Sequence, residues 1–379
     1  MIGSLGLDIL QKLWWLIASL VGSLFLFLTF VQGGQTLLPF LARSPEEKSL
    51  IVNSLGRKWE LTFTTLVLFG GALFAAFPLF YATSFGGAYW VWLAILFTFV
   101  IQAVSYEYRR KPGNLLGTAT YDLFLLVNGS LGILLIGAAV GTFFTGANFT
   151  LNAYNLVAWT HPLRGLEAAF NPFNVSLGLF LVFVARLQGA LYLLNNLDCT
   201  APAMKALEGR CRRAAFGNLL FALPFLLFVL FRLLTMDGLA VDAAGRVSVE
   251  AGKYLHNLMA MPLVALLLLA GLVLVVAGVA LARFGASRRG IWLAGPGVVL
   301  TGLAVFCLAG LNHTPFYPSL ADPAKSLTIA NASSSLYTLT AMTYVALAVP
   351  LVVGYIAYVW RLMDRKKLGP ADLEEAELY

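Results

Sequence analysis

Charged residues are scarce in this sequence. Only 11% of its 379 residues are Asp, Glu, Lys or Arg, whereas hydrophobic residues make up 60%. Soluble domains usually contain a charged share of about 25%. This composition excludes an ordinary soluble protein and favours a chain that folds in a lipid bilayer.

Histidine and cysteine are also rare. The three histidines, His161, His256 and His313, all fall in loops or at helix ends. No histidine is therefore available on a helix inside the membrane to ligate a haem. The three cysteines form no C-x-x-C pair, so we expect neither a metal site nor a disulfide. The common nucleotide, zinc and hydrolase motifs are absent too, and we expect no catalytic centre in this chain alone.

Long apolar runs are what the sequence has instead. Residues 13–31 contain no charge, and eight further apolar stretches of spanning length follow. A bilayer core of about 30 Å requires about 20 residues of helix, and helices satisfy their own backbone groups. The sequence therefore predicts an all-α integral membrane protein with about nine transmembrane helices in a single polytopic domain, residues 1–379. The predicted spans are 13–38, 61–83, 88–106, 121–144, 173–194, 214–234, 259–284, 291–311 and 336–363.

The first span resembles a retained helix rather than a signal peptide, because its apolar run is long and no A-x-A-like cleavage site follows it. Before the second span, Ser44-Pro45-Glu46-Glu47 combines an N-cap serine, a proline at the first helical position and a capping-box glutamate. This pattern predicts a short surface helix over 45–55.

Basic residues gather in alternate connections between the spans. Eighteen of the 25 Lys and Arg lie in connections one, three, five and seven or in the tail after the last span. The positive-inside rule places these segments in the cytoplasm. We therefore expect the N-terminus outside, the C-terminus in the cytoplasm and no nucleic-acid partner.

Strongly polar residues within the spans or at their mouths are candidates for function, because they are costly in lipid. Each has an ordinary alternative, which is an interhelical hydrogen bond worth about 0.6–2 kcal/mol or a charge at the membrane interface. Both readings stay open at this point. The candidates are Gln32, Gln35, Glu60, Gln102, Asp122, Asn128, Arg186 and Gln188.

Several sequence blocks occur in an order that characterises one membrane protein family. They are Leu13-Trp14-Trp15, Val52-Asn53-Ser54, Trp59-Glu60, Gly70-Gly71-Ala72-Leu73-Phe74-Ala75-Ala76-Phe77-Pro78, Tyr106-Glu107-Tyr108-Arg109, Asn171-Pro172-Phe173, Gln188-Gly189-Ala190-Leu191-Tyr192-Leu193, Pro315-Phe316-Tyr317-Pro318-Ser319 and, most specific of all, Ser326-Leu327-Thr328-Ile329-Ala330-Asn331-Ala332-Ser333-Ser334-Ser335. Together they extend over nearly the whole chain. In this respect the sequence resembles subunit II of the cytochrome bd quinol oxidases.

The resemblance implies a heterodimer in the bacterial cytoplasmic (inner) membrane. Its partner, subunit I, would bind haems b and d and the quinol, while this haem-free subunit scaffolds it and assists cytoplasmic proton uptake for the reduction of oxygen to water. The resemblance further implies two four-helix bundles plus one peripheral helix. It leaves open a small single-helix subunit, a structural quinone and bound membrane lipids.

The same resemblance indicates where protons would travel. The family carries acids in a D-G-F-D pattern on its first helix, which reads Gln32-Gly33-Gly34-Gln35 here, so both carboxylates are replaced by amides. The acid that follows a tryptophan before the second helix is kept as Trp59-Glu60, and an arginine of many members aligns with Gln102. The implied proton-path residues are Glu60, Gln35 and Gln32, with Trp59 and Gln102 at an interface or lining the path.

Two other functions are consistent with parts of the sequence. A secondary transporter is suggested by Arg186 and Gln188 in the fifth span and by the many glycines, although the sequence has no matching pair of interrupted spans. A purely structural scaffold would differ only in giving Glu60 no role. Co-purification with a haem-bearing partner distinguishes the transporter, and a Glu60 variant distinguishes the scaffold.

The distribution of basic residues makes a testable prediction of topology. Reporter proteins that are active on one side of the membrane only, fused in separate experiments after Lys367 and after Gly245, should give opposite signals. The first should report a cytoplasmic position and the second an external one. Matching signals would show that the number of spans between these residues is off by one.

Overall fold

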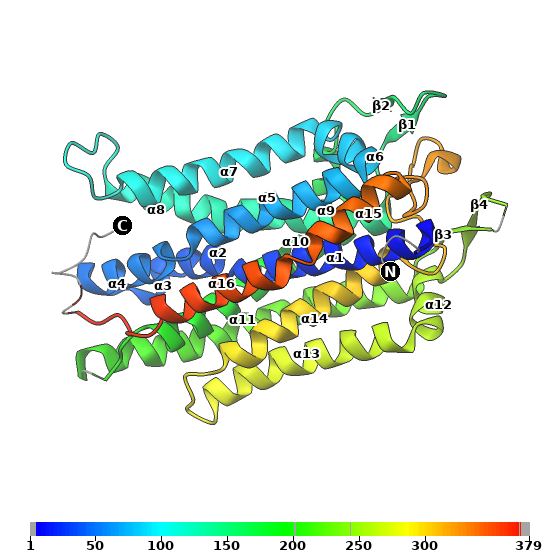
Figure 1. Cartoon of the computed structure of the whole chain (residues 1–379). Coiled ribbons are helices and arrows are strands. Elements are labelled where there is room, and N and C mark those ends of the chain that lie inside the picture. Colours follow the sequence, from blue (N-terminus) through cyan, green and yellow to red (C-terminus); the bar gives the residue numbers. More distant parts are fainter. Residues whose placement is uncertain (1–4, 201, 243, 371, 373–379) are drawn as a thin grey trace.

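The computed structural model describes residues 5–200, 202–242, 244–370 and 372. Within these residues, nine helical segments are long and apolar enough to cross a membrane, as the sequence predicts. They run side by side along one axis, with connections at both ends of the bundle (Figure 1). The segments are Leu7–Thr36, Pro45–Ala76, Tyr89–Tyr108, Thr118–Thr145, Pro172–Asn196, Met204–Thr235, Pro262–Arg283, Ile291–Gly310 and Leu336–Met363.

Several spans are built from more than one helix. The α-helices are α1 (Leu7–Leu28), α2 (Phe30–Thr36), α3 (Leu38–Leu41), α4 (Pro45–Gly56), α5 (Trp59–Ala76), α6 (Pro78–Tyr81), α7 (Tyr89–Tyr108), α8 (Thr118–Val127), α9 (Ile133–Thr145), α10 (Pro172–Asn196), α11 (Pro202–Thr235), α12 (Lys253–Ala260), α13 (Pro262–Arg283), α14 (Ile291–Gly310), α15 (Leu336–Ala346) and α16 (Val349–Met363). Two π-helical turns, Ala82–Gly86 and Asn128–Gly132, and two 3-10 turns, Leu166–Phe170 and Pro323–Lys325, join them.

Several helix ends differ from the ends of the predicted spans, and three of them have a clear sequence cause or consequence. The second span ends at Ala76 instead of residue 83, because Pro78 disfavours a helical conformation in Phe77, whose φ is −132°. The helix of the sixth span, α11, begins at Pro202 rather than near residue 214. Its polar first turns therefore extend beyond the predicted apolar run. The helix of the seventh span, α13, begins at Pro262 instead of residue 259, because this proline separates α13 from the short α12.

The predicted helix over 45–55 is present as α4. The Ser44 side chain accepts a hydrogen bond from the Glu47 backbone N–H at 3.2 Å, and Glu47 accepts one from the Arg43 N–H at 2.6 Å. The prediction that this helix lies on the surface is wrong, because Leu50 and Ile51 are fully buried. Its apolar face packs against α2 and α10.

The most deeply buried span is α10, which packs against α2, α9 and α11. Glycines permit the closest approach, between α2 and α10. A Cβ atom on Gly33 would lie 1.9 Å from the Ala185 carbonyl, and one on Gly189 would lie 2.2 Å from the Gly34 nitrogen. At the other extreme, the α15–α16 span is the least buried. The division into two four-helix bundles and a peripheral helix stays a prediction.

Two antiparallel hairpins occupy the end of the bundle opposite α4 (Figure 1). Strand β1 (Phe149–Leu151) pairs with β2 (Val157–Trp159), and β3 (Gly238–Val241) pairs with β4 (Val247–Glu250). Both hairpins lie in connections that the charge pattern assigns to the outside. We therefore refer to this end as the outer end and to the α4 end as the inner end.

The contact between α2 and α10 predicts a selective effect of adding one methyl group. Gly33→Ala should force the helices apart and destabilise the protein by about 1–3 kcal/mol. Gly71→Ala is the matched control, because a Cβ atom there meets nothing within 4 Å and alanine favours a helix. The thermal midpoint of the detergent-purified protein should fall for Gly33→Ala only; equal midpoints would refute the importance of this contact.

Candidate functional site

Four buried amide side chains form one hydrogen-bonded cluster near the inner half of the bundle. Gln32 donates to the Gln102 Oε1 atom at 3.3 Å, and Gln102 donates to the Gln35 Oε1 atom at 3.0 Å. Gln35 donates in turn to the Asn128 Oδ1 atom at 2.8 Å, and the Tyr106 hydroxyl donates to Gln35 Oε1 at 3.1 Å. We call these five residues the amide cluster.

The amide cluster is deeply buried, and most of its polar atoms are satisfied by hydrogen bonds within the protein. Each of its side chains is at most 1% exposed. Gln35 also donates to the Leu125 carbonyl at 2.8 Å. Two buried atoms in the cluster, Gln32 Oε1 and Asn128 Nδ2, have no hydrogen-bond partner. Such atoms usually mark a place where an ordered water binds.

Local backbone geometry explains why these amides meet. The glycine face of α2 lies against α10, so Gln32 and Gln35 project toward α7 and α8 instead. A π-helical turn begins at Asn128, and such turns re-aim side chains within a span. Gly129 completes the approach, because a Cβ atom there would lie 2.2 Å from the Gln32 carbonyl oxygen.

Trp59 joins the amide cluster indirectly. Its ring stacks on Tyr106 with centroids 5.9 Å apart and an interplanar angle of 9°. Glu60, the next residue, has an exposed side chain and makes no hydrogen bond to the cluster in the described part of the chain. The structure therefore brings together Gln32, Gln35, Gln102 and Trp59, but it leaves Glu60 on the outside of the bundle.

A buried ion pair lies beside the same helix start, and sequence reasoning missed it. The Lys58 Nζ atom is 3.1 Å from Asp364 Oδ1, and the Lys58 side chain is fully buried. Asn196 donates to the same Asp364 oxygen at 3.2 Å. Lys58 also lies 4.7 Å from the centroid of the Trp360 ring. The sequence offers only a weak signal, since both charges fall just outside predicted spans.

The remaining polar candidates have mainly structural contacts. Asp122 forms ion pairs with Arg109, at 2.9 Å, and with Lys48. Arg186 donates to the Thr36 hydroxyl at 3.0 Å. Gln188 is completely buried, and neither atom of its amide has a partner among the described residues. The contacts of Asp122 and Arg186 are those expected of an ion pair at the membrane interface and of a hydrogen bond between helices.

The amide side chains and the ionisable side chains of this region differ in whether they can hold a proton. Amides do not titrate, so the amide cluster can orient water but cannot itself hold a proton as an acid. Titratable groups flank it at Glu60, at the Lys58–Asp364 pair and at Asp122. Across the described residues, no three His, Cys, Asp or Glu side chains are grouped so that they could hold a metal ion.

The difference between Gln35 and Gln188 gives a matched test of this geometry. Gln35→Leu removes the partner of several buried groups, each of which costs about 1–3 kcal/mol when unsatisfied. Gln188→Leu makes the same change at an equally buried amide that has no partner within the described ranges, so stability should be unchanged or higher. Thermal unfolding of the purified protein should separate the variants, and equal losses would contradict the cluster.

Comparison with known proteins agrees with this architecture. Residues 10–363 match the family model of cytochrome bd terminal oxidase subunit II. The cytochrome bd-I ubiquinol oxidase subunit 2 of Escherichia coli is 28% identical, over 94% of this chain and 95% of the relative. A probable cytochrome oxidase subunit 2 of Haemophilus influenzae is 27% identical, over 98% of this chain and 99% of the relative.

The fold also resembles a solved structure. The bd oxidase from Geobacillus thermodenitrificans contains a chain that superimposes with a TM-score of 0.62, covering 94% of this chain and 98% of that one at 13% identity. This likeness supports the fold, and the sequence match supports the family. The chain belongs to the cytochrome bd terminal oxidase subunit II family, and it is thus a subunit of a respiratory oxidoreductase.

Proposed function

We propose that this chain is the haem-free subunit of a cytochrome bd-type quinol:oxygen oxidoreductase. It scaffolds a subunit I that holds haems b and d, and it assists proton uptake from the cytoplasm for the reduction of oxygen to water. Family membership over residues 10–363 supports the subunit assignment. The secondary transporter has no comparable support.

The proposed orientation follows from charge. Most of the basic connections lie at the inner end, which supports a cytoplasmic position for that end, with the N-terminus outside in the bacterial inner membrane. In this orientation, the Trp59 end of α5 faces the source of the protons. Glu60 then stands at the entrance, where a carboxylate can exchange protons with water.

The observation that carries the proton-uptake proposal is the connection from Trp59 to the amides. Trp59 stacks on Tyr106, Tyr106 bonds to Gln35, and Gln35 bonds to Gln102 and Asn128. Because amides cannot ionise, protons would pass this region along water molecules oriented by the free Gln32 and Asn128 atoms. The amide cluster would therefore order the path, while Glu60 would supply the titrating group.

The exposure of Glu60 also supports a role at the subunit interface. A carboxylate that faces lipid is costly, so such residues usually face protein or water. The neighbouring outward face of α5 is apolar and exposed, including Val67, Leu68 and Phe74. We infer that subunit I covers this face and that Glu60 passes its proton toward the partner.

Glu60→Gln tests this role, because it keeps the size and hydrogen bonding of the side chain but removes the titrating group. Quinol-driven oxygen consumption by the purified complex should fall several-fold between about pH 6 and 8. The visible spectrum and thermal midpoint should not change. Glu46→Gln is the control, since Glu46 is an exposed acid at the same end of the bundle.

Two results with the Glu60→Gln complex would contradict a role of Glu60 in proton uptake. If the Glu60→Gln complex retains the parental rate over the whole pH range, Glu60 is only structural and protons enter through the partner subunit. If the spectrum of the haems is lost as well as the rate, Glu60 supports assembly rather than proton uptake.

A further inference from the structure

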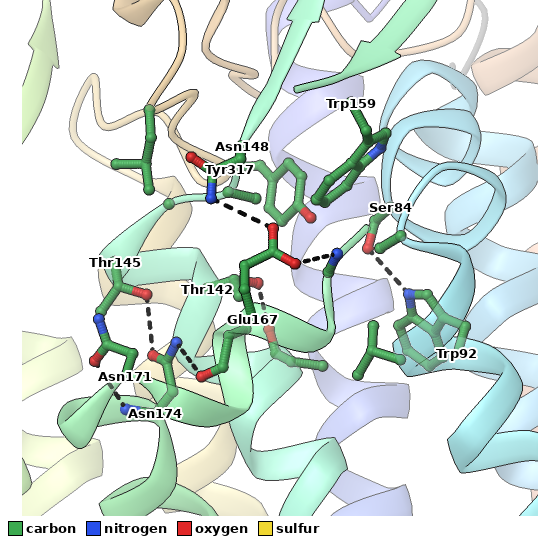
Figure 2. A pocket seen from close by; sticks show the side chains of 18 residues that line it. Ser84, Trp92, Thr142, Thr145, Asn148, Trp159, Glu167, Asn171, Asn174 and Tyr317 are labelled. Carbon is green, nitrogen blue, oxygen red and sulfur yellow. Dashed lines mark hydrogen bonds between the residues drawn. The ribbon is translucent and has the colours of Figure 1, made fainter. Parts of the chain in front are cut away.

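A cavity of about 140 Å³, with one carboxylate in its lining, lies at the outer end of the bundle, away from the amide cluster. Figure 2 shows it below the β1–β2 hairpin, with side chains from several separate elements directed toward a common space. Its floor and walls come from α7, α9, α10 and the segment that carries Tyr317. Neither the family resemblance nor the proposed function uses this cavity.

Glu167 is the only charged residue among those that line the cavity. Its carboxylate is at the centre of the view in Figure 2, and its side chain is only 16% exposed. Asn148 donates to its Oε1 atom at 3.3 Å, and the Gly165 backbone N–H donates to its Oε2 atom at 2.7 Å. These bonds fix the carboxylate against the wall of the cavity.

Among the described residues, the basic group within ion-pair distance of Glu167 is a histidine and not a Lys or Arg. This group is His161, whose Nδ1 is 3.5 Å from Oε2. That same Nδ1 accepts a hydrogen bond from the Leu163 N–H at 3.2 Å. The carboxylate and the Leu163 N–H thus share one ring nitrogen of a histidine, whereas a mostly buried carboxylate normally has a closer cationic partner.

Several N–H donors that line the cavity are hydrogen-bonded to other protein groups. The Asn174 amide donates to the Ala168 carbonyl at 3.1 Å, and the Trp92 indole donates to the Ser84 hydroxyl at 3.3 Å. The Trp159 indole donates to the Thr83 carbonyl at 3.1 Å. Burial raises the pKa of the Tyr317 hydroxyl, which therefore stays neutral. The cavity thus presents one negative charge, neutral oxygen atoms and two indole rings.

This lining fits an organic cation better than a metal ion. Calcium takes six to eight oxygen ligands, commonly several carboxylates, whereas this wall supplies one carboxylate. The cavity also exceeds the roughly 30 Å³ that one water occupies in the liquid. Aromatic rings near a carboxylate are a common environment for an ammonium group. Exposed Tyr89 and Trp90 at the start of α7 place the cavity at the level of an aromatic membrane belt.

We propose that this cavity binds a primary ammonium group, with Glu167 as its counter-ion. The ammonium can come from the headgroup of a phosphatidylethanolamine in the surrounding membrane or from a small soluble amine. Both sources offer the same N–H donors and positive charge to the carboxylate. The location at the interface favours the lipid.

Native mass spectrometry of the purified oxidase complex tests the proposal. After delipidation, the complex is incubated with phosphatidylethanolamine, with phosphatidylglycerol of the same acyl chains, or with ethanolamine. Phosphatidylethanolamine should be retained and phosphatidylglycerol should not. Glu167→Gln should weaken retention about tenfold or more, as expected for loss of a charge-assisted bond. Asp237→Asn, which neutralises an exposed acid of another outer loop, should leave retention unchanged.

Further measurements distinguish the two sources of the ammonium group, and a conservative variant controls for misfolding. A saturable rise in thermal midpoint with ethanolamine, without lipid retention, would identify a soluble amine and still support the site. Glu167→Asp should restore part of the binding that Glu167→Gln loses. Equal retention of the two lipids by the parent complex, together with equal effects of ethanolamine and uncharged ethylene glycol, would overturn the proposal without any variant. Unchanged ammonium binding in Glu167→Gln would overturn it too.

Discussion

The close contact between α2 and α10 is the constraint on which the inner half of this subunit depends. Helices in lipid gain little from hydrophobic association with one another, so their pairing relies on tight packing of small residues. Gly33 and Gly189 allow the two backbones to touch. Because one face of α2 is used in this way, its two glutamines must face α7 and the π-helical turn. The amide cluster is thus a consequence of helix packing.

Apart from Arg186 in α10, neutral and ionisable polar groups are largely separated along the bundle. The amides are buried with nearly complete hydrogen bonding, which avoids the desolvation cost of a charge in the membrane. The ionised side chains lie toward the ends, where Lys58 pairs with Asp364 and Asp122 pairs with Arg109. With amides at positions 32 and 35, this part of the core is dense and needs no cationic partners for these two side chains.

The sequence predicts the coarse fold because apolar length and basic-residue alternation are local signals. It places the second and seventh spans less well, since Pro78 and Pro262 break helices inside continuous apolar runs. The family resemblance identifies Gln32, Gln35 and Gln102 one by one, but their mutual bonding depends on the π-helical turn at Asn128. The Lys58–Asp364 pair joins distant parts of the chain, and no periodicity reveals such a contact. Likewise, the exposure of Glu60 depends on which face of α5 packs inward.

The exposed position of Glu60 has a physical implication for the whole complex. Within this chain, α5 buries little of its surface, and its outward face combines large apolar side chains with one carboxylate. Lipid would cover the apolar side chains without penalty, but it would not solvate the acid. A protein partner with a polar group or water at the matching depth resolves both requirements. The exposure of this acid is therefore consistent with the proposed contact between α5 and a second subunit.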